Sequence, residues 1–211
     1  SFTGWIITCA AKALSEHKEL NAYRKGKNKI IYFDDVDIPI PVERTLNNEK
    51  IPMVYILRKA NEKNLIEITK EIRSVQKQTV DGEKQVLGQE FTLLEKIAFK
   101  APMFFKKFLL FVVQHSPKLK KKHMGTLGVT AVGMKGHMPG WIIPLGGTTT
   151  ILFVIGGITR KPGVIENDII AVRDYLHVTM AVDHDLIDGG PLARFLERFI
   201  ELCEQGYGIP K

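Results

Sequence analysis

Hydrophobic positions recur with a helical period at both ends of the chain and in one stretch between them. Over residues 2–17 and 64–78, apolar side chains fall three or four positions apart, which predicts two amphipathic helices. A third helix is predicted over 191–204, where Pro191 suits the first turn. Its apolar face comprises Leu192, Phe195, Leu196, Phe199 and Cys203.

Strand patterns lie between these helices. Over 36–42 every second residue is apolar, but Pro39 and Pro41 lack the N–H of a central strand and predict an edge or irregular strand. The other predicted strands cover 29–33, 53–57, 164–172 and 175–183, with β-forming stretches at 125–136 and 148–157. Together with the helices they predict one domain of mixed α/β type.

Residues 89–123 have a different texture, because they are rich in phenylalanine and lysine. We expect two short helices interrupted at Pro102 and then a basic run over 118–123. The apolar part, 104–113, could form a lid, a lipid-surface helix or an oligomer contact, and packing in the core is the favoured interpretation. The longest uncharged apolar run there is far short of the roughly 20 residues of a membrane span.

Composition narrows the class of protein. The 211 residues are 45% hydrophobic and 25% charged, which is a globular mix. The net charge of +7 favours anionic partners such as phosphorylated cofactors, nucleic acid or an anionic membrane surface. Both cysteines, Cys9 and Cys203, lie in apolar helical patterns, so we expect free core thiols and a cytoplasmic protein.

The most informative segment runs from a predicted strand into the C-terminal helix. His184 follows the strand, and four residues later Asp188 precedes Gly189. A histidine at a strand end can protrude into a cleft as a general base, and glycine permits a sharp turn. The same pattern also suits an ordinary surface histidine. The acidic residues nearby lack a second cluster of ligands, so we expect no metal site.

The segment H-D-L-I-D-G (184–189) matches the H-x-x-x-D-G signature of the chloramphenicol acetyltransferase-like acyltransferases. The wider chain resembles the catalytic domain of the dihydrolipoamide acyltransferase component of 2-oxo acid dehydrogenase complexes. Segments 1–22, 30–43, 65–75 and 181–204 each resemble part of that domain, in the same order. Because Asp185 replaces the arginine of the familiar D-H-R, the chain is more similar to stand-alone members of the superfamily that carry D-H-D.

This resemblance implies a CoA-dependent acyltransferase, with acyl-CoA as one substrate and a thiol, hydroxyl or amine as acceptor. His184 would be the general base, and Thr130, in L-G-V-T-A-V-G (127–133), would stabilise the oxyanion. Asp188 would orient the histidine loop, and Gly189 would form its turn. The implied fold is a two-layer α/β sandwich in which a mixed sheet carries helices on one face.

The resemblance also implies a homotrimer, or a larger trimer-based assembly, with active sites between subunits. We expect residues 1–211 to form a single catalytic domain without the family's first helix and strand, a lipoyl domain or a subunit-binding domain. Lys120, Lys121 and Lys122 could hold the phosphates of CoA, or could simply be a solvated basic loop. Aromatic residues are not interleaved with these lysines, which argues against nucleic-acid binding. The alternative function is a non-catalytic trimeric scaffold of the same fold.

Overall fold

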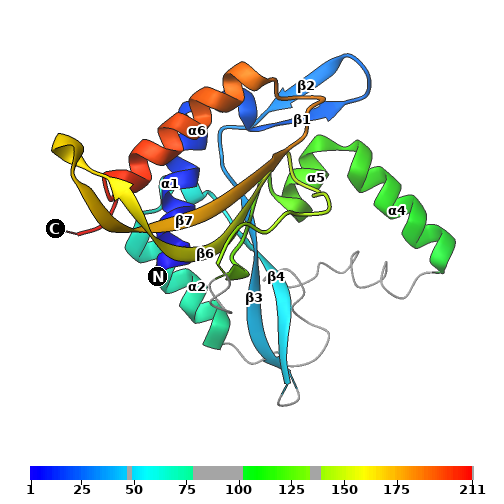
Figure 1. Cartoon of the computed structure of the whole chain (residues 1–211). Coiled ribbons are helices and arrows are strands. Elements are labelled where there is room, and N and C mark those ends of the chain that lie inside the picture. The colour runs from blue at the N-terminus through cyan, green and yellow to red at the C-terminus, as the bar shows by residue number, and fades with distance from the viewer. Residues whose placement is uncertain (47–48, 78–101, 134–138, 211) are drawn as a thin grey trace.

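The computed structural model describes residues 1–46, 49–77, 102–133 and 139–210. Helices α1, α2 and α6 gather at one side of the molecule, and α4 and α5 lie at the other (Figure 1). The helices are α1 (Phe2–Glu16), α2 (Leu65–Lys77), α4 (Met103–His115), α5 (Pro117–Met124) and α6 (Gly189–Glu204). The strands are β1 (Ala22–Lys25), β2 (Lys29–Tyr32), β3 (Ile38–Leu46), β4 (Glu49–Leu57), β5 (Leu127–Thr130), β6 (Ile151–Val164) and β7 (Ile170–Val182).

Helix α1 is the centre of the helical layer. The Ser1 side chain caps it by accepting a hydrogen bond from the Gly4 N–H at 3.3 Å. Its burial extends beyond the predicted stripe, because α2 and α6 both pack against it. Cys9 is fully buried here, and both cysteines are free thiols, as the sequence predicted.

The sheet that carries the predicted active-site residues has the order β5-β6-β7. Strands β5 and β6 are parallel, whereas β6 and β7 are antiparallel. On the helix-covered face, the Phe153 ring packs against Phe195 and Phe199 of α6, with ring centroids 6.0 and 4.8 Å apart. A mixed sheet with helices on one face confirms the predicted two-layer α/β sandwich.

Among the described strands, β3 pairs only with β4. Strand β5 packs beside β3 but shares no ladder with it. Pro39 and Pro41 have no N–H to donate to a ladder, which is why the sequence predicted an edge or irregular strand here. Between α5 and β5 the chain passes close to β3 at Gly125, whose φ is +67°. A Cβ at Gly125 would lie 2.4 Å from the Asp37 carbonyl oxygen and 2.5 Å from Pro39 Cδ, so this passage requires glycine.

The prediction of a strand over 164–172 was wrong, because this segment contains the turn of a long hairpin. Strand β6 ends at Val164 and β7 begins at Ile170, with the Ile165 N–H bonded to the Ile169 carbonyl at 2.8 Å. Asn167 and Asp168 have φ values of 61° and 57°. Asparagine and aspartate tolerate this left-handed conformation better than most residues, which permits the turn.

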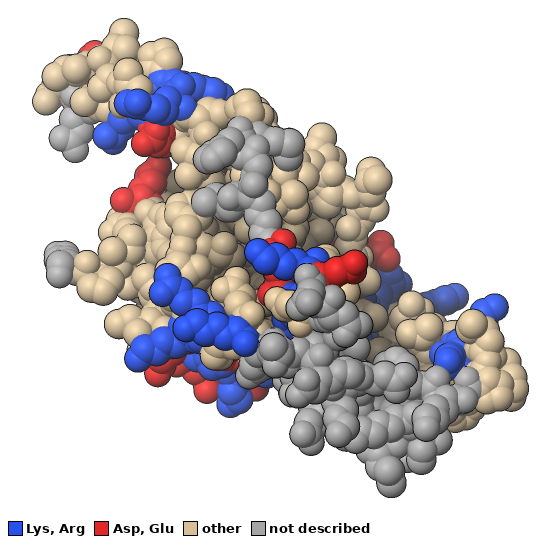
Figure 2. Space-filling view, turned by 90° about the horizontal axis from the view of Figure 1, so that it is seen from below, with Lys and Arg blue, Asp and Glu red and all other residues tan. Residues whose placement is uncertain are grey.

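The basic run over 118–123 also differs from the solvated loop that was expected. Residues 117–124 form helix α5 rather than a loop, with Pro117 in its first turn. The helix expected before Pro102 lies outside the described residues. The expectation that 104–113 packs in the core was wrong, because every residue of α4 is described and none is buried. Figure 2 shows the end of the molecule where α4 lies as a largely tan surface with blue lysines.

Candidate active site

His184 lies on the short loop that joins β7 to α6. The loop is anchored at its start, where the Asp183 N–H donates to the Thr150 carbonyl at 2.9 Å. It then turns, because the N–H groups of Leu186 and Ile187 both donate to the Asp183 carbonyl. Ile187 is buried, whereas His184 is exposed. The histidine is therefore presented outward from a fixed base, and its side chain has no hydrogen bond or ion pair with the described part of the chain.

Asp185 has a partner that the sequence did not reveal. Its carboxylate lies 2.9 Å from the Arg24 guanidinium of β1. This arginine balances the negative charge that Asp185 adds beside His184. The two residues are 161 positions apart, and β1 itself was not predicted, so no local signal links them. Strand β1 also accepts a hydrogen bond from the Thr150 hydroxyl through the Ala22 carbonyl, and Thr150 in turn anchors Asp183.

Asp188 and Gly189 begin helix α6. Asp188 is the N-cap residue, and its carbonyl accepts from the Leu192 N–H at 3.2 Å. Its exposed carboxylate makes no hydrogen bond within the described ranges. Gly189 is the first helical residue rather than part of a turn, and a Cβ there would meet nothing within 4 Å. The chain reversal comes earlier, at residues 184–186.

Thr130 ends strand β5 on the face of the sheet that points away from the helices. Its neighbours Leu127 and Val129 point into the core, so strand alternation places Thr130 and Gly128 on the opposite face. Thr130 lies in one register row with Val154 and Thr179. It lines a hollow of about 290 Å³ together with Pro39, Pro41 and Leu152.

Thr130 and the His184 loop belong to opposite edges of this sheet, because Thr130 ends β5 and His184 follows β7. From the row of Thr130, three residues of β7, or roughly 10 Å, lead to Val182, two residues before His184. The two strand spacings between β5 and β7 add about 10 Å across the sheet. A reacting carbonyl must lie within about 3 Å of both the nucleophile and the oxyanion donor, and the base must be in hydrogen-bond reach of that nucleophile. One copy of the chain does not bring these two side chains together.

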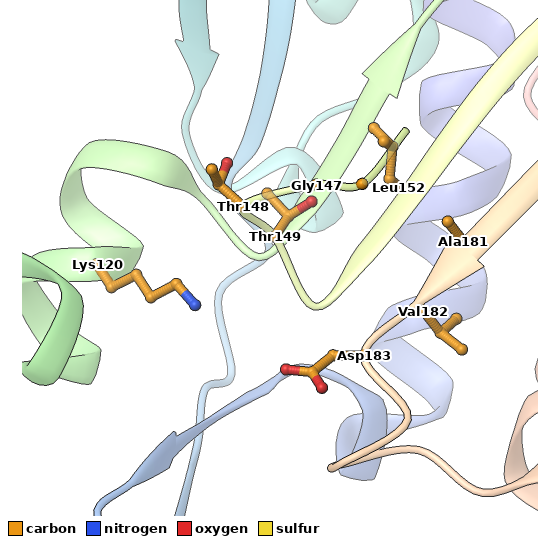
Figure 3. Close-up of a pocket in the computed structure, with 9 residues that line it drawn as sticks. Lys120, Gly147, Thr148, Thr149, Leu152, Ala181, Val182 and Asp183 are labelled. Atoms are coloured by element: carbon orange, nitrogen blue, oxygen red, sulfur yellow. The ribbon is translucent and has the colours of Figure 1, made fainter. Parts of the chain in front are cut away.

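A second hollow of about 270 Å³ lies beside the base of the His184 loop (Figure 3). Lys120 of α5 extends toward it from one side, and Asp183 lies at the other. The Lys120 ammonium lies 4.2 Å from the centre of the Tyr23 ring. Burial lowers the pKa of Lys120, and the Asp183 carboxylate opposes that change. Both hollows are lined by Gly147, Thr148, Thr149 and Leu152, so they adjoin one another.

The three lysines proposed for CoA point to different surroundings. Lys120 lines the hollow just described, whereas Lys121 lies 3.5 Å from Asp37 and 3.9 Å from Asp35. Lys122 is exposed, and its backbone carbonyl accepts a hydrogen bond from Arg58. Helix geometry separates them, because successive residues on a helix face directions about 100° apart. Among the described residues, no three His, Cys, Asp or Glu side chains are arranged as a metal site.

The structure also reveals polar residues that hold the base of the site. The buried Tyr23 hydroxyl donates to the Gly125 carbonyl at 2.5 Å, which ties β1 to the start of β5. Burial raises the pKa of Tyr23, and the charge of Asp183 acts in the same direction. The Thr126 hydroxyl bonds to the Asn21 side chain, which is itself bonded to the carbonyls of Phe33 and Asp35. Sequence analysis missed this network because its members are scattered singly through polar stretches.

Comparisons with known proteins agree with this architecture. The chain is 25% identical over 208 residues to the lipoamide acyltransferase component of the branched-chain alpha-keto acid dehydrogenase complex of Bacillus subtilis (strain 168). That alignment covers 97% of this chain and 39% of the relative, so the chain spans about two fifths of that protein's length.

Two solved structures show the same fold. A probable dihydrolipoamide acetyltransferase from Listeria monocytogenes 4b F2365 has a TM-score of 0.69 and 21% identity, covering 97% of this chain and 70% of the other. The dihydrolipoamide acetyltransferase of Azotobacter vinelandii has a TM-score of 0.63 and 15% identity, covering 96% and 68%. The Azotobacter work concerns the catalytic role of a serine, a histidine and an asparagine four positions after the histidine.

A family profile matches residues 1–94 and 113–208, on both sides of the segment that leads into and includes most of α4. Its description is "2-oxoacid dehydrogenases acyltransferase (catalytic domain)". The match covers most of the chain and includes the strands and loop that carry Thr130 and His184. This chain belongs to the 2-oxoacid dehydrogenase acyltransferase catalytic-domain family.

Proposed function

We propose that this protein transfers an acyl group between CoA and the thiol of a dihydrolipoamide-type acceptor. The observation that carries the proposal is His184, which is exposed on an anchored loop and has no side-chain partner among the described residues, in a chain of this family. In the proposed step, His184 takes the proton from the acceptor thiol as its sulfur attacks the thioester carbonyl. The bond to the CoA sulfur then breaks, and the proton passes from His184 to the CoA thiolate.

Thr130 is the proposed oxyanion donor. Its hydroxyl position on the open sheet face, at the edge of a hollow, suits a donor directed at a substrate carbonyl. The Azotobacter enzyme's serine and histidine correspond in type to Thr130 and His184, and its asparagine corresponds in spacing from the histidine to Asp188. Asp188 has the spacing of that asparagine, and we assign it the task of orienting the histidine loop.

The active site is proposed to form between subunits. His184 of one subunit would meet Thr130 of its neighbour, since the two belong to opposite edges of the sheet within one chain. A trimer would repeat this contact at each of its interfaces. The adjoining hollows along residues 147–149 would then hold the extended CoA arm, with Lys120 facing a phosphate. Lys121 is less suited to this task because Asp37 and Asp35 already surround its charge.

The test is to incubate acetyl-CoA with dihydrolipoamide and to measure the CoA formed by chromatography. We expect His184→Ala to lower kcat by about 10²- to 10⁴-fold, the contribution of a general base. Thr130→Val, which removes the hydroxyl and keeps the shape, should cost about 10²- to 10³-fold, and Thr130→Ser should retain most activity. His115→Ala on α4 is the matched histidine control. Full activity in His184→Ala would overturn the assignment of the base.

Subunit mixing tests the shared site. Coexpression of His184→Ala with Thr130→Val should restore activity, because about a quarter of the interfaces would pair an intact histidine with an intact threonine. Mixing should restore nothing if both residues act within one chain. If the wild type transfers acetyl to dihydrolipoamide, alcohols or amines at no measurable rate, the scaffold alternative replaces the enzyme.

A further inference from the structure

Helix α4 presents an exposed aromatic stripe. Phe104, Phe108 and Phe111 follow one another at i, i+4 and i+7, so they lie on one side of the helix. Their side chains are 74%, 58% and 56% exposed. Met103 and Leu110 are exposed as well. Isolated exposed apolar residues are common, but a run of this kind on one helix marks an interaction surface.

The charge of the chain is concentrated at the same place. Residues 103–124, which form α4 and α5, contain six lysines and no Asp or Glu. The rest of the chain therefore has a formal charge of only +1. Lys107 is three residues after Phe104 and four before Phe111, so it flanks the aromatic stripe. Lys106 and Lys118 extend the basic surface along the two helices.

The exposed phenylalanines and the clustered lysines distinguish between two possible partners of this surface, a second copy of α4 and an anionic bilayer. A symmetric contact between two copies of α4 would bring two groups of lysines together without acidic residues on either helix, which is unfavourable. An anionic bilayer offers both features that this surface needs, an apolar interior for the phenylalanines and diffuse negative charge for the lysines. None of the described helices has the length and apolar content of a membrane span. Such a helix would lie along the bilayer surface.

We propose that α4, together with the exposed Lys118 of α5, docks this protein onto the surface of an anionic lipid bilayer. Most of α4 falls in the stretch 95–112 that the family profile does not match, so the docking surface is an addition to the catalytic domain. Neither α4 nor Lys118 lines the two hollows of the proposed active site, whereas Lys120 does and is not part of the docking surface. Membrane docking can therefore be tested separately from acyl transfer.

The experiment sediments the full-length protein with phosphatidylcholine vesicles that lack or contain about one third phosphatidylglycerol. We expect binding to the anionic vesicles only, and weaker binding at about 0.5 M salt because the Debye length falls to roughly 4 Å. The variant Lys106→Gln/Lys107→Gln should bind about 30-fold more weakly, at about 1 kcal/mol per lysine. The triple variant Phe104→Ser/Phe108→Ser/Phe111→Ser should lose at least about 100-fold, because three apolar side chains no longer enter the bilayer.

Two control variants carry matched changes elsewhere. Lys70→Gln/Arg73→Gln neutralises two exposed charges on α2, and Ile170→Ser/Val172→Ser removes exposed apolar side chains on β7. Both controls should bind vesicles like the wild type. The proposal is overturned if the wild type stays in the supernatant with anionic vesicles, or if the α4 variants bind as well as the controls. A failure to pellet, combined with a smaller oligomer for the triple phenylalanine variant in sedimentation velocity, would reassign α4 to a contact between copies.

Discussion

Helices α6 and α4 both carry phenylalanines four residues apart, but their surroundings are opposite. Phe195 and Phe199 of α6 are buried against Phe153 of the sheet, whereas Phe104 and Phe108 of α4 are exposed. The spacing of apolar residues determines that a helix has a stripe, and it does not determine what covers the stripe. In α6 the sheet of the same chain covers it. In α4 the covering surface must come from outside the described part of the chain.

The largest expected effect comes from a matched pair of truncations, one in α6 and one in α4. Phe195→Ala should lower the free energy of unfolding by about 3–5 kcal/mol, because it leaves a cavity between α6 and the sheet. Phe108→Ala should change it by less than about 0.5 kcal/mol, because the ring is already exposed to water. Urea unfolding of both variants measures the difference. Equal losses would mean that α4 is part of the cooperative core.

Gly125 connects the α4–α5 region to the sheet, because it lies between α5 and β5. Its φ of +67° and the short distance that would separate an added Cβ from the Asp37 carbonyl oxygen leave no room for a side chain. Gly125→Ala should lower the free energy of unfolding by about 2–3 kcal/mol, through backbone strain and displacement of α5. Gly26→Ala is the control, because its φ is +65° but nothing lies within 4 Å. If both variants lose the same stability, strain alone accounts for the effect and the close approach does not matter.

The smallest expected effect concerns the ion pair between α1 and α6. Arg198 lies 2.6 Å from Glu16, and its hydrogen bond holds the pKa of the Glu16 carboxyl below the ordinary value of 4.5. A carboxyl whose pKa is lowered by folding adds stability above its unfolded pKa and loses it as the pH falls through the folded value. Arg198→Ala should therefore lower Tm slightly at neutral pH, and the difference from wild type should shrink below pH 4.5. A difference that stays constant into acid would show that the arginine acts through packing alone.

Local patterns predicted the main helices well. The stripes at 2–17, 64–78 and 191–204 correspond to α1, α2 and α6, because helical periodicity is a property of neighbouring residues. The strand prediction at 164–172 failed because apolar residues flank a turn whose geometry depends on Asn167 and Asp168. Helix α5 was missed because its lysines resembled a solvated loop, although Ser116 before it and Pro117 at its first position are typical of a helix start.

For the candidate site, the sequence predicted individual residues but not the contacts between distant segments. The sequence motif located His184, Thr130 and Asp188, and their roles remain predictions. It could not indicate that Arg24 pairs with Asp185, or that Lys120 and Lys121 point to different surroundings. These relations join segments distant in sequence, and they depend on how β1, α5 and the sheet pack together.

Neighbouring residues and short motifs were enough to predict the family resemblance, the principal helices, the edge character of β3 and the residues on which the chemistry is proposed. Each of these depends on neighbouring residues or on a short motif. The packing of distant segments places His184 and Thr130 at opposite edges of one sheet, and it leaves the aromatic stripe of α4 exposed among the described residues. Burial and separation are set by contacts between distant segments, and a pattern along the chain does not contain them.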